Sequence, residues 1–227
     1  MRRVIIPLLF GILGTAVLVA LGVWQVQRLA WKEGLLADIE ARIAATPVAL
    51  PAEPDPERHA FLPVEVTGTM ENRALRVLVS RKSAGAGYRL VSPFEIDGRR
   101  ILLDRGFIRV SKDIPAPPDG RVAIIGNLRW PDDRNASTPE NDVAGNTWFA
   151  RDLGAMAAEL GTEPVLVVAR ETSYSDGPVT PLPVDTSHIP NDHLGYAITW
   201  FGLAAIWVVM TGYFLWRGRR TDKGTTP

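Results

Sequence analysis

The sequence predicts a membrane protein of the α+β class, in which a two-helix transmembrane hairpin flanks an antiparallel β-rich outer domain with one or two helices. Two uncharged apolar segments near the chain ends predict the spans, and short β-rich runs between turn residues predict the domain. The chain has 227 residues, which suffices for one domain of ordinary size and two spans.

The first apolar segment, residues 4–27, contains no charge and exceeds the length of about 20 residues that crosses a bilayer. A cleaved signal peptide is the competing interpretation, because a basic start and an apolar core are common to both. The core is long, however, and no small-x-small cleavage pattern follows it. We therefore favour an uncleaved transmembrane helix.

The second apolar segment, residues 194–216, is followed at once by the basic tail, residues 217–227. Because cytoplasmic flanks are rich in Lys and Arg, this tail is expected in the cytoplasm, and two crossings place both termini there. Residues 28–192 then form a periplasmic domain. Met1, Arg2 and Arg3 lead directly into the first span, which favours a bacterial inner membrane over a mitochondrial one with its basic leader.

Glycine and threonine recur on both spans at spacings that let helices approach closely, namely Gly11, Thr15 and Gly22 on the first and Gly195, Thr199 and Gly202 on the second. These residues predict a packed hairpin. The alternative is that glycine is simply frequent in membrane helices.

After the first span, the helical pattern continues toward Ala45 and a proline-rich, acidic linker follows. Five β-rich runs come next, between residues 61 and 130, and Asp97-Gly98 marks the clearest hairpin. A helix over residues 151–161, ended by Gly161, precedes a last strand. The strands are expected to form an antiparallel sheet that can curl into a partial barrel.

Composition excludes several classes of function. The chain has no cysteine, so disulfides, thiolate metal sites and copper delivery through paired thiolates are excluded. Acidic side chains outnumber basic ones between the spans, which argues against a nucleic-acid partner. Only His59 and His188 offer neutral-pH acid–base groups in the outer domain. His59 lies in the linker beside Arg58. His188 lies near Asp185 and Ser187, and a solvated loop explains it better than a catalytic triad. We therefore predict that the protein is not an enzyme.

His193 lies one residue before the second span. An ionisable side chain so close to lipid is costly unless it has a function or access to water. In an antiparallel hairpin, the outer end of the first span lies at the same level as His193. Helical spacing puts one set of side chains on one face of each helix, Trp24, Arg28 and Trp31 on the first and His193, Tyr196 and Trp200 on the second, with Gln25 beside the first set.

A neutral imidazole can ligate haem iron, aromatic walls can cover the macrocycle, and an arginine can pair with propionates. We therefore hypothesise that these residues form a haem-binding site. The alternative is an interfacial aromatic belt, in which Arg28 anchors in the headgroups and His193 is merely hydrated.

Five segments, in this order, resemble the surfeit locus protein 1 family of cytochrome oxidase assembly proteins: LGVWQVQRLAWK, GYRLVSPFEI, ILLDRGFI, TPENDVAGNTWFARDL and NDHLGYAITWFGLA. The resemblance extends from Leu21 to Ala204. It implies two spans around a periplasmic domain and a role in maturing haem-copper oxidase, with haem A held for insertion into the catalytic subunit. A histidine at the start of the second span, the family's candidate ligand, corresponds to His193. Trp24, Gln25 and Arg28 match the family's first motif, and we infer that they contact the haem.

The partners expected from this resemblance are the catalytic subunit of cytochrome c oxidase, proteins of haem A synthesis or delivery, and the lipid bilayer. The alternative is a scaffold that stabilises an oxidase assembly intermediate and never binds haem. Neither span offers an evident second axial ligand, because His193 is the only histidine near them and Met210 lies toward the cytoplasmic end.

Overall fold

The computed structural model describes residues 2–81, 84–187 and 189–223 and divides the chain into two compact units. The two ends of the chain, up to Asp38 and from Ser187, form the first unit, which we call the helix pair. Residues Ile39–Thr186 form the second unit, the β domain.

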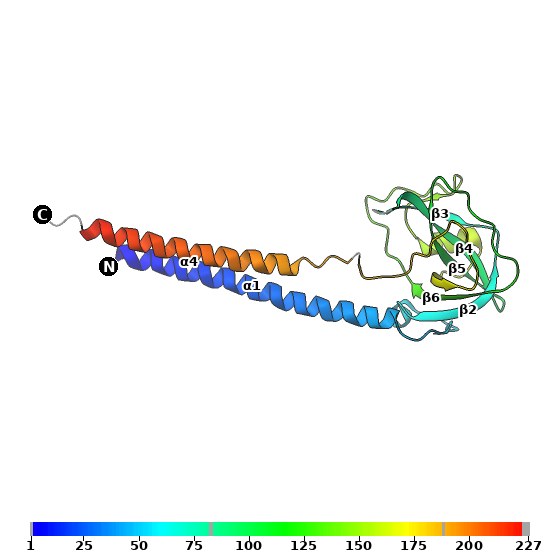
Figure 1. Cartoon of the computed structure of the whole chain (residues 1–227), viewed down its shortest axis with the longest axis horizontal. Helices are drawn as coiled ribbons and strands as arrows, with labels where there is room; N and C mark the ends of the chain where they lie inside the picture. Colours follow the sequence, from blue (N-terminus) through cyan, green and yellow to red (C-terminus); the bar gives the residue numbers. More distant parts are fainter. Residues whose placement is uncertain (1, 82–83, 188, 224–227) are drawn as a thin grey trace. The chain divides into compact units, whose positions relative to one another are not determined.

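The helix pair consists of α1 (Arg2–Ile43) and α4 (His193–Lys223), which run antiparallel and side by side (Figure 1). Each helix contains a stretch long and apolar enough to cross a membrane. Large apolar side chains such as Leu13, Ile206 and Val209 are exposed along them. This exposure is the pattern expected of helices surrounded by lipid.

The two helices approach each other closely at glycines of α1. A Cβ atom added at Gly11 would lie 2.3 Å from Cγ2 of Thr211, and one at Gly22 would lie 2.7 Å from the ring of Phe201. The predicted packed hairpin is thus present, but among the glycines predicted for it only those of α1 lie at the contact. Gly195 and Gly202 of α4 have no atom within 4 Å of an added Cβ, so they make no close approach.

A barrel forms the centre of the β domain. Its strands β2 (Pro63–Met70), β6 (Val122–Arg129), β8 (Leu166–Thr172), β5 (Arg99–Arg109) and β4 (Gly85–Ile96) are neighbours in that order, and β4 pairs back onto β2. Three short or outlying strands extend this sheet, namely β3 (Leu75–Arg81) beside β4, β7 (Thr147–Trp148) beside β3, and β1 (Val48–Ala49) beside β2.

Alternation along the strands divides the core of the β domain into two layers. Phe94, Leu103 and Val167 belong to the cluster inside the barrel. Leu102, next to Leu103 on β5, and Val168, next to Val167 on β8, pack on the other face against the helix α3 (Leu153–Leu160). Because successive side chains of a strand point to opposite faces, one pair of strands supplies both layers.

The predicted fold class, α+β with helices at both chain ends, is confirmed. Asp97 and Gly98 both have positive φ and form the two-residue turn between β4 and β5, as predicted. Gly161 ends α3 in the left-handed conformation, also as predicted. The predicted barrel is present as well.

The sheet is mixed rather than purely antiparallel, because β8 is parallel to β5. These strands are separated in the chain by β6, β7 and α3, and so long a connection permits a parallel crossover that the sequence pattern did not reveal. The predicted linker is also partly structured, since it contains β1 and a one-turn helix, α2 (Pro56–His59), capped by Asp55.

Candidate functional site

His193 is the first residue of α4 and contacts the other helix of the pair. Its Nδ1 lies 2.7 Å from Oε1 of Gln25, a hydrogen bond between residues 168 positions apart. The imidazole is half-buried, whereas the Gln25 side chain is inside the pair, with 8% of the residue exposed. The two residues that the sequence placed at one level are therefore direct partners.

Gln25 faces α4 because of its position on the helix. It lies three residues after Gly22, so both residues are on the face of α1 that meets α4. On α4, Ala197 and Ala204 follow His193 on the inner face and are buried. Small side chains around this point let the polar pair fit between the two helices.

The other residues predicted for the site surround this pair without hydrogen bonding to it. Trp24 and Tyr196 are 50% and 57% exposed, and Trp200 is half-buried. Arg28 is exposed and stacks on its own helix, with its guanidinium carbon 4.6 Å from the centroid of the Trp31 ring. Their predicted roles toward haem stay predictions.

These residues fit a haem in chemical terms. The Nε2 atom of His193 makes no hydrogen bond to any residue that the structure describes, so this nitrogen is not engaged by the protein. A neutral imidazole with an unprotonated nitrogen can ligate haem iron. Exposed aromatic faces on both helices match a flat macrocycle, and Arg28 has no ion pair among the described residues. An uncommitted cation near an anionic propionate is favourable.

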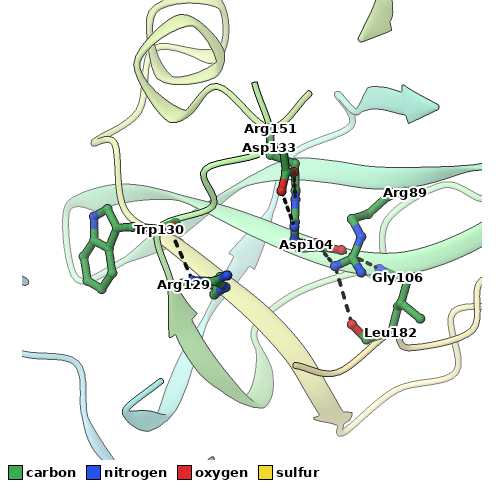
Figure 2. A network of polar contacts seen from close by, with 8 residues as sticks. All are labelled: Arg89, Asp104, Gly106, Arg129, Trp130, Asp133, Arg151 and Leu182. Carbon is green, nitrogen blue, oxygen red and sulfur yellow. Dashed lines mark hydrogen bonds and ion pairs between the residues drawn. The ribbon is translucent and has the colours of Figure 1, made fainter. Parts of the chain in front are cut away.

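A second polar network lies within the β domain (Figure 2). Asp104 of β5 has no exposure to solvent, and its Oδ2 accepts a hydrogen bond of 2.5 Å from Arg89 of β4. Its Oδ1 accepts the backbone N–H of Gly106 at 3.1 Å. Arg151 approaches the same carboxylate to 3.9 Å and binds Asp133 through two hydrogen bonds of 2.6 and 3.1 Å.

Burial and neighbouring charges shift the pKa values of two side chains in and beside this network, Asp133 and Arg129. Burial alone would raise the pKa of Asp133, but hydrogen bonds and the positive charge of Arg151 outweigh it and lower the pKa below its usual value. Arg129 is different, because burial and the nearby charge of Arg151 lower its pKa. It lies over the ring of Phe61, 5.0 Å from the centroid.

A cavity of about 270 Å³ adjoins this network and is lined by Trp130, Asp133 and Arg151, among others. In its wall, Asp133 and Arg151 form an ion pair with each other, and Arg134 pairs with Glu140. No cluster of three potential metal ligands occurs in the described ranges. We therefore assign the network a structural role in the β domain.

Asp104 and Arg105 are not among the site residues that the sequence predicts. The available signal was a pair of charges inside the apolar run ILLDRGFI, since an ionised side chain within a buried strand needs a partner. Arg105 pairs with Asp176 through hydrogen bonds of 2.9 and 2.5 Å, and both side chains are buried.

The structure describes one of the two histidines between the spans, His59. His59 accepts a hydrogen bond from the backbone N–H of Asp55 at 3.0 Å, a contact that closes α2. His188 lies outside the described residues.

Comparison with known proteins gives consistent relatives. A model of the SURF1 family matches residues 12–205. The chain is 34% identical to Surfeit locus protein 1 of Homo sapiens over 210 residues, which cover 82% of this chain and 69% of that protein. It is 33% identical to Surfeit locus protein 1 of Rattus norvegicus over 209 residues, covering 82% of this chain and 68% of that one.

A bacterial relative matches over nearly its whole length. The chain is 32% identical to the SURF1-like protein of Rickettsia felis over 214 residues, which cover 88% of this chain and 92% of that protein. The matched region contains all of the β domain, most of α1, and the part of α4 that carries His193. The chain belongs to the SURF1 family.

Proposed function

We propose that this protein is an assembly factor for haem-copper cytochrome c oxidase that holds haem A at the outer membrane boundary and assists its insertion into the catalytic subunit. Its family is known as one of cytochrome oxidase assembly factors, which are generally non-enzymatic. The observation that carries the haem part of the proposal is His193, whose Nδ1 is engaged by Gln25 while its Nε2 is available.

Each side chain of the site has a proposed task. His193 offers Nε2 as an axial ligand, and bound haem A supplies an iron with an open coordination position. Trp24, Tyr196 and Trp200 would flank the macrocycle, and Arg28 would hold a propionate near the headgroups. A site on the helix surface suits a transient cargo, because the macrocycle can leave without unfolding the protein.

The proposed location is a bacterial inner membrane, with α1 and α4 crossing it, both termini in the cytoplasm and the β domain in the periplasm. The basic residues at the C-terminal end of α4 and the apolar surfaces of both helices support this orientation. The proposed partners are the catalytic subunit of the oxidase and the proteins that make or deliver haem A. The β domain would dock on nascent oxidase subunits.

The test compares the absorption spectra of full-length wild type and His193→Ala, both purified in mild detergent from cells that make haem A. We expect a haem A spectrum in the wild type and its loss in the variant. His59→Ala is the matched control, because it removes a histidine of the β domain. Its haem content should equal that of the wild type.

Equal haem content in His193→Ala would refute the ligand role. Recovery of the oxidase subunit in a pull-down, with no pigment at any expression level, would instead support the scaffold that never binds haem. Oxidase activity in membranes of the two strains then reports whether the site matters for assembly.

A further inference from the structure

Gln25 is the one polar side chain that the described part of the helix pair buries almost completely. A buried amide without a partner is costly in an apolar environment, so its position needs a compensating contact. That contact is His193, across the pair, at 2.7 Å. The hydrogen bond therefore decides where both side chains lie.

The atoms of this hydrogen bond also decide where the imidazole carries its proton. The Oε1 atom of Gln25 is an acceptor and has no proton to give. In the arrangement that places this oxygen against the ring, the Nδ1 atom of His193 is the donor. A neutral imidazole has a single N–H, so Nε2 is left with a lone pair and without a proton.

We propose that Gln25 is a positioning residue, which does not touch haem but holds His193 in the Nδ1–H tautomer with Nε2 presented as the ligand. This inference rests on the proposed haem function and changes the role predicted for Gln25 from cofactor contact to support of the ligand. Histidines that ligate metals commonly donate their other N–H to a carbonyl or carboxylate, which fixes ring orientation and raises ligand basicity.

The burial of Gln25 supports this division of roles. With 8% exposure on the inner face of α1, its amide has little surface left for a macrocycle. Trp24, the adjacent residue, is 50% exposed and is the side chain of this turn that can touch one. Successive helical residues point about 100° apart. Gln25 can therefore face α4 and support His193, while Trp24 on the same turn faces outward toward a macrocycle.

The experiment compares Gln25→Leu, Gln25→Glu and Gln27→Leu in the full-length protein in detergent micelles. Gln25→Leu removes the acceptor and keeps the approximate size, and Gln25→Glu keeps an oxygen acceptor. Gln27→Leu is the matched control, because Gln27 is exposed on the same helix two residues away.

The first measurement uses no haem. Histidine-selective ¹⁵N NMR at a pH where imidazole is neutral shows which ring nitrogen carries the proton, and His193→Ala identifies the signal. We expect Nδ1–H in the wild type, Gln27→Leu and Gln25→Glu. In Gln25→Leu, loss of one neutral hydrogen bond should lower the ratio of Nδ1–H to Nε2–H roughly two- to tenfold.

The second measurement is titration of haem A into the haem-free proteins. Gln25→Leu should bind about 10- to 100-fold more weakly, the usual effect of removing a histidine's outer partner. Gln25→Glu should bind at least as well as wild type and should have a lower haem reduction potential, because a carboxylate makes the ligand more electron-donating.

An Nε2–H signal in the wild type would overturn the inference, even if Gln25→Leu failed to fold. So would wild-type haem affinity in a folded Gln25→Leu. A merely structural role for Gln25 predicts lower stability in Gln25→Leu with an unchanged tautomer. If the wild type binds no haem but shows Nδ1–H lost in Gln25→Leu, the positioning contact stands and the proposed haem function fails.

Discussion

The carboxylate of Asp104 and the guanidinium of Arg89 form an ion pair across two neighbouring strands of the β domain, and none of Asp104 is exposed to solvent. An ionised carboxylate in the interior is tolerated only where charges and hydrogen bonds surround it. Here Arg89 and the backbone N–H of Gly106 provide both. The stability of the β domain should therefore depend on this one side chain.

Asp104→Asn should destabilise the protein by about 3–5 kcal/mol, because it leaves the positive charge of Arg89 partly buried without a counter-charge. Urea unfolding of the full chain in mild detergent, followed by near-ultraviolet circular dichroism, measures the loss. Asp97→Asn is the control, since the ion pair of Asp97 with Arg121 is largely exposed and should contribute less than about 1 kcal/mol. Equal losses in both variants would contradict the assigned role of Asp104.

Gly106→Ala should be among the most damaging single changes in the β domain. Gly106 has a φ of 120°, and an added Cβ would lie 2.2 Å from the backbone oxygen of Thr180. Gly120 provides a matched comparison, because its φ is also positive, 77°, but nothing lies within 4 Å of an added Cβ.

We expect Gly120→Ala to cost about 1–2 kcal/mol for the left-handed backbone alone. Gly106→Ala should lose more than about 4 kcal/mol, since the backbone of another segment must also shift. Unfolding curves of the two variants, measured side by side, separate the two effects. Gly120→Ala reports backbone strain alone, and Gly106→Ala reports backbone strain together with the steric clash. Similar losses would mean that the segment around Thr180 moves freely.

The stability of the β domain should fall in acid because of Asp133. Its pKa is lower in the folded protein than its ordinary value of about 3.9 in an unfolded chain. The contact with Arg151 therefore contributes fully above that ordinary value, and the contribution disappears as the pH falls through the folded pKa.

Asp133→Asn should cost about 1 kcal/mol at neutral pH, because solvent screens this partly exposed ion pair, and should flatten the acid dependence. Asp132→Asn is the control, because Asp132 is exposed and makes no ion pair with the described residues. Unfolding free energies from pH 7 down to about pH 3 test this, around the ordinary carboxyl pKa. A slope unchanged in Asp133→Asn would be contrary evidence.

Oxidation of a cysteine pair should report the packing of α1 on α4. The natural chain has no cysteine, so Gly11→Cys with Thr211→Cys introduces a single possible bond. A Cβ at Gly11 would lie 3.1 Å from Cβ of Thr211, close to the separation of about 3.5–4.5 Å in disulfides.

Most of this double variant should therefore form the intramolecular disulfide under mild oxidation. A protease site inserted at the exposed Glu53 makes it visible, because the two halves stay joined until reduced. Gly11→Cys with Val209→Cys is the control, since Val209 is 69% exposed on another face of α4. Comparable cross-linking of both pairs would argue against the observed packing.

Local patterns in the sequence were sufficient for the elements. The lengths of the uncharged runs predicted both long helices, Asp97-Gly98 predicted its turn, and Gly161 predicted the end of α3. Each of these features depends on residues adjacent in the chain, through burial preference or the φ angles that glycine allows. The pairing of strands was harder to predict from the sequence. The partners β5 and β8, for example, are separated by a long segment of the chain.

The candidate site was predictable only in part. The level of His193 relative to Trp24, Gln25 and Arg28 followed from antiparallel crossing of two helices of known length. Which of them faces the histidine depends on the rotation of each helix about its axis, and packing of Gly11 and Gly22 against α4 determines that rotation.

The sequence by itself determined that two apolar helices enclose a β-rich domain and that a histidine begins the second helix, because hydrophobic length and residue spacing are local properties. Only the tertiary structure decided that Gln25 is the partner of His193 and that Asp104 lies buried against Arg89. Both contacts join segments that are separate in the chain, and the burial that makes each contact consequential exists only once those segments pack.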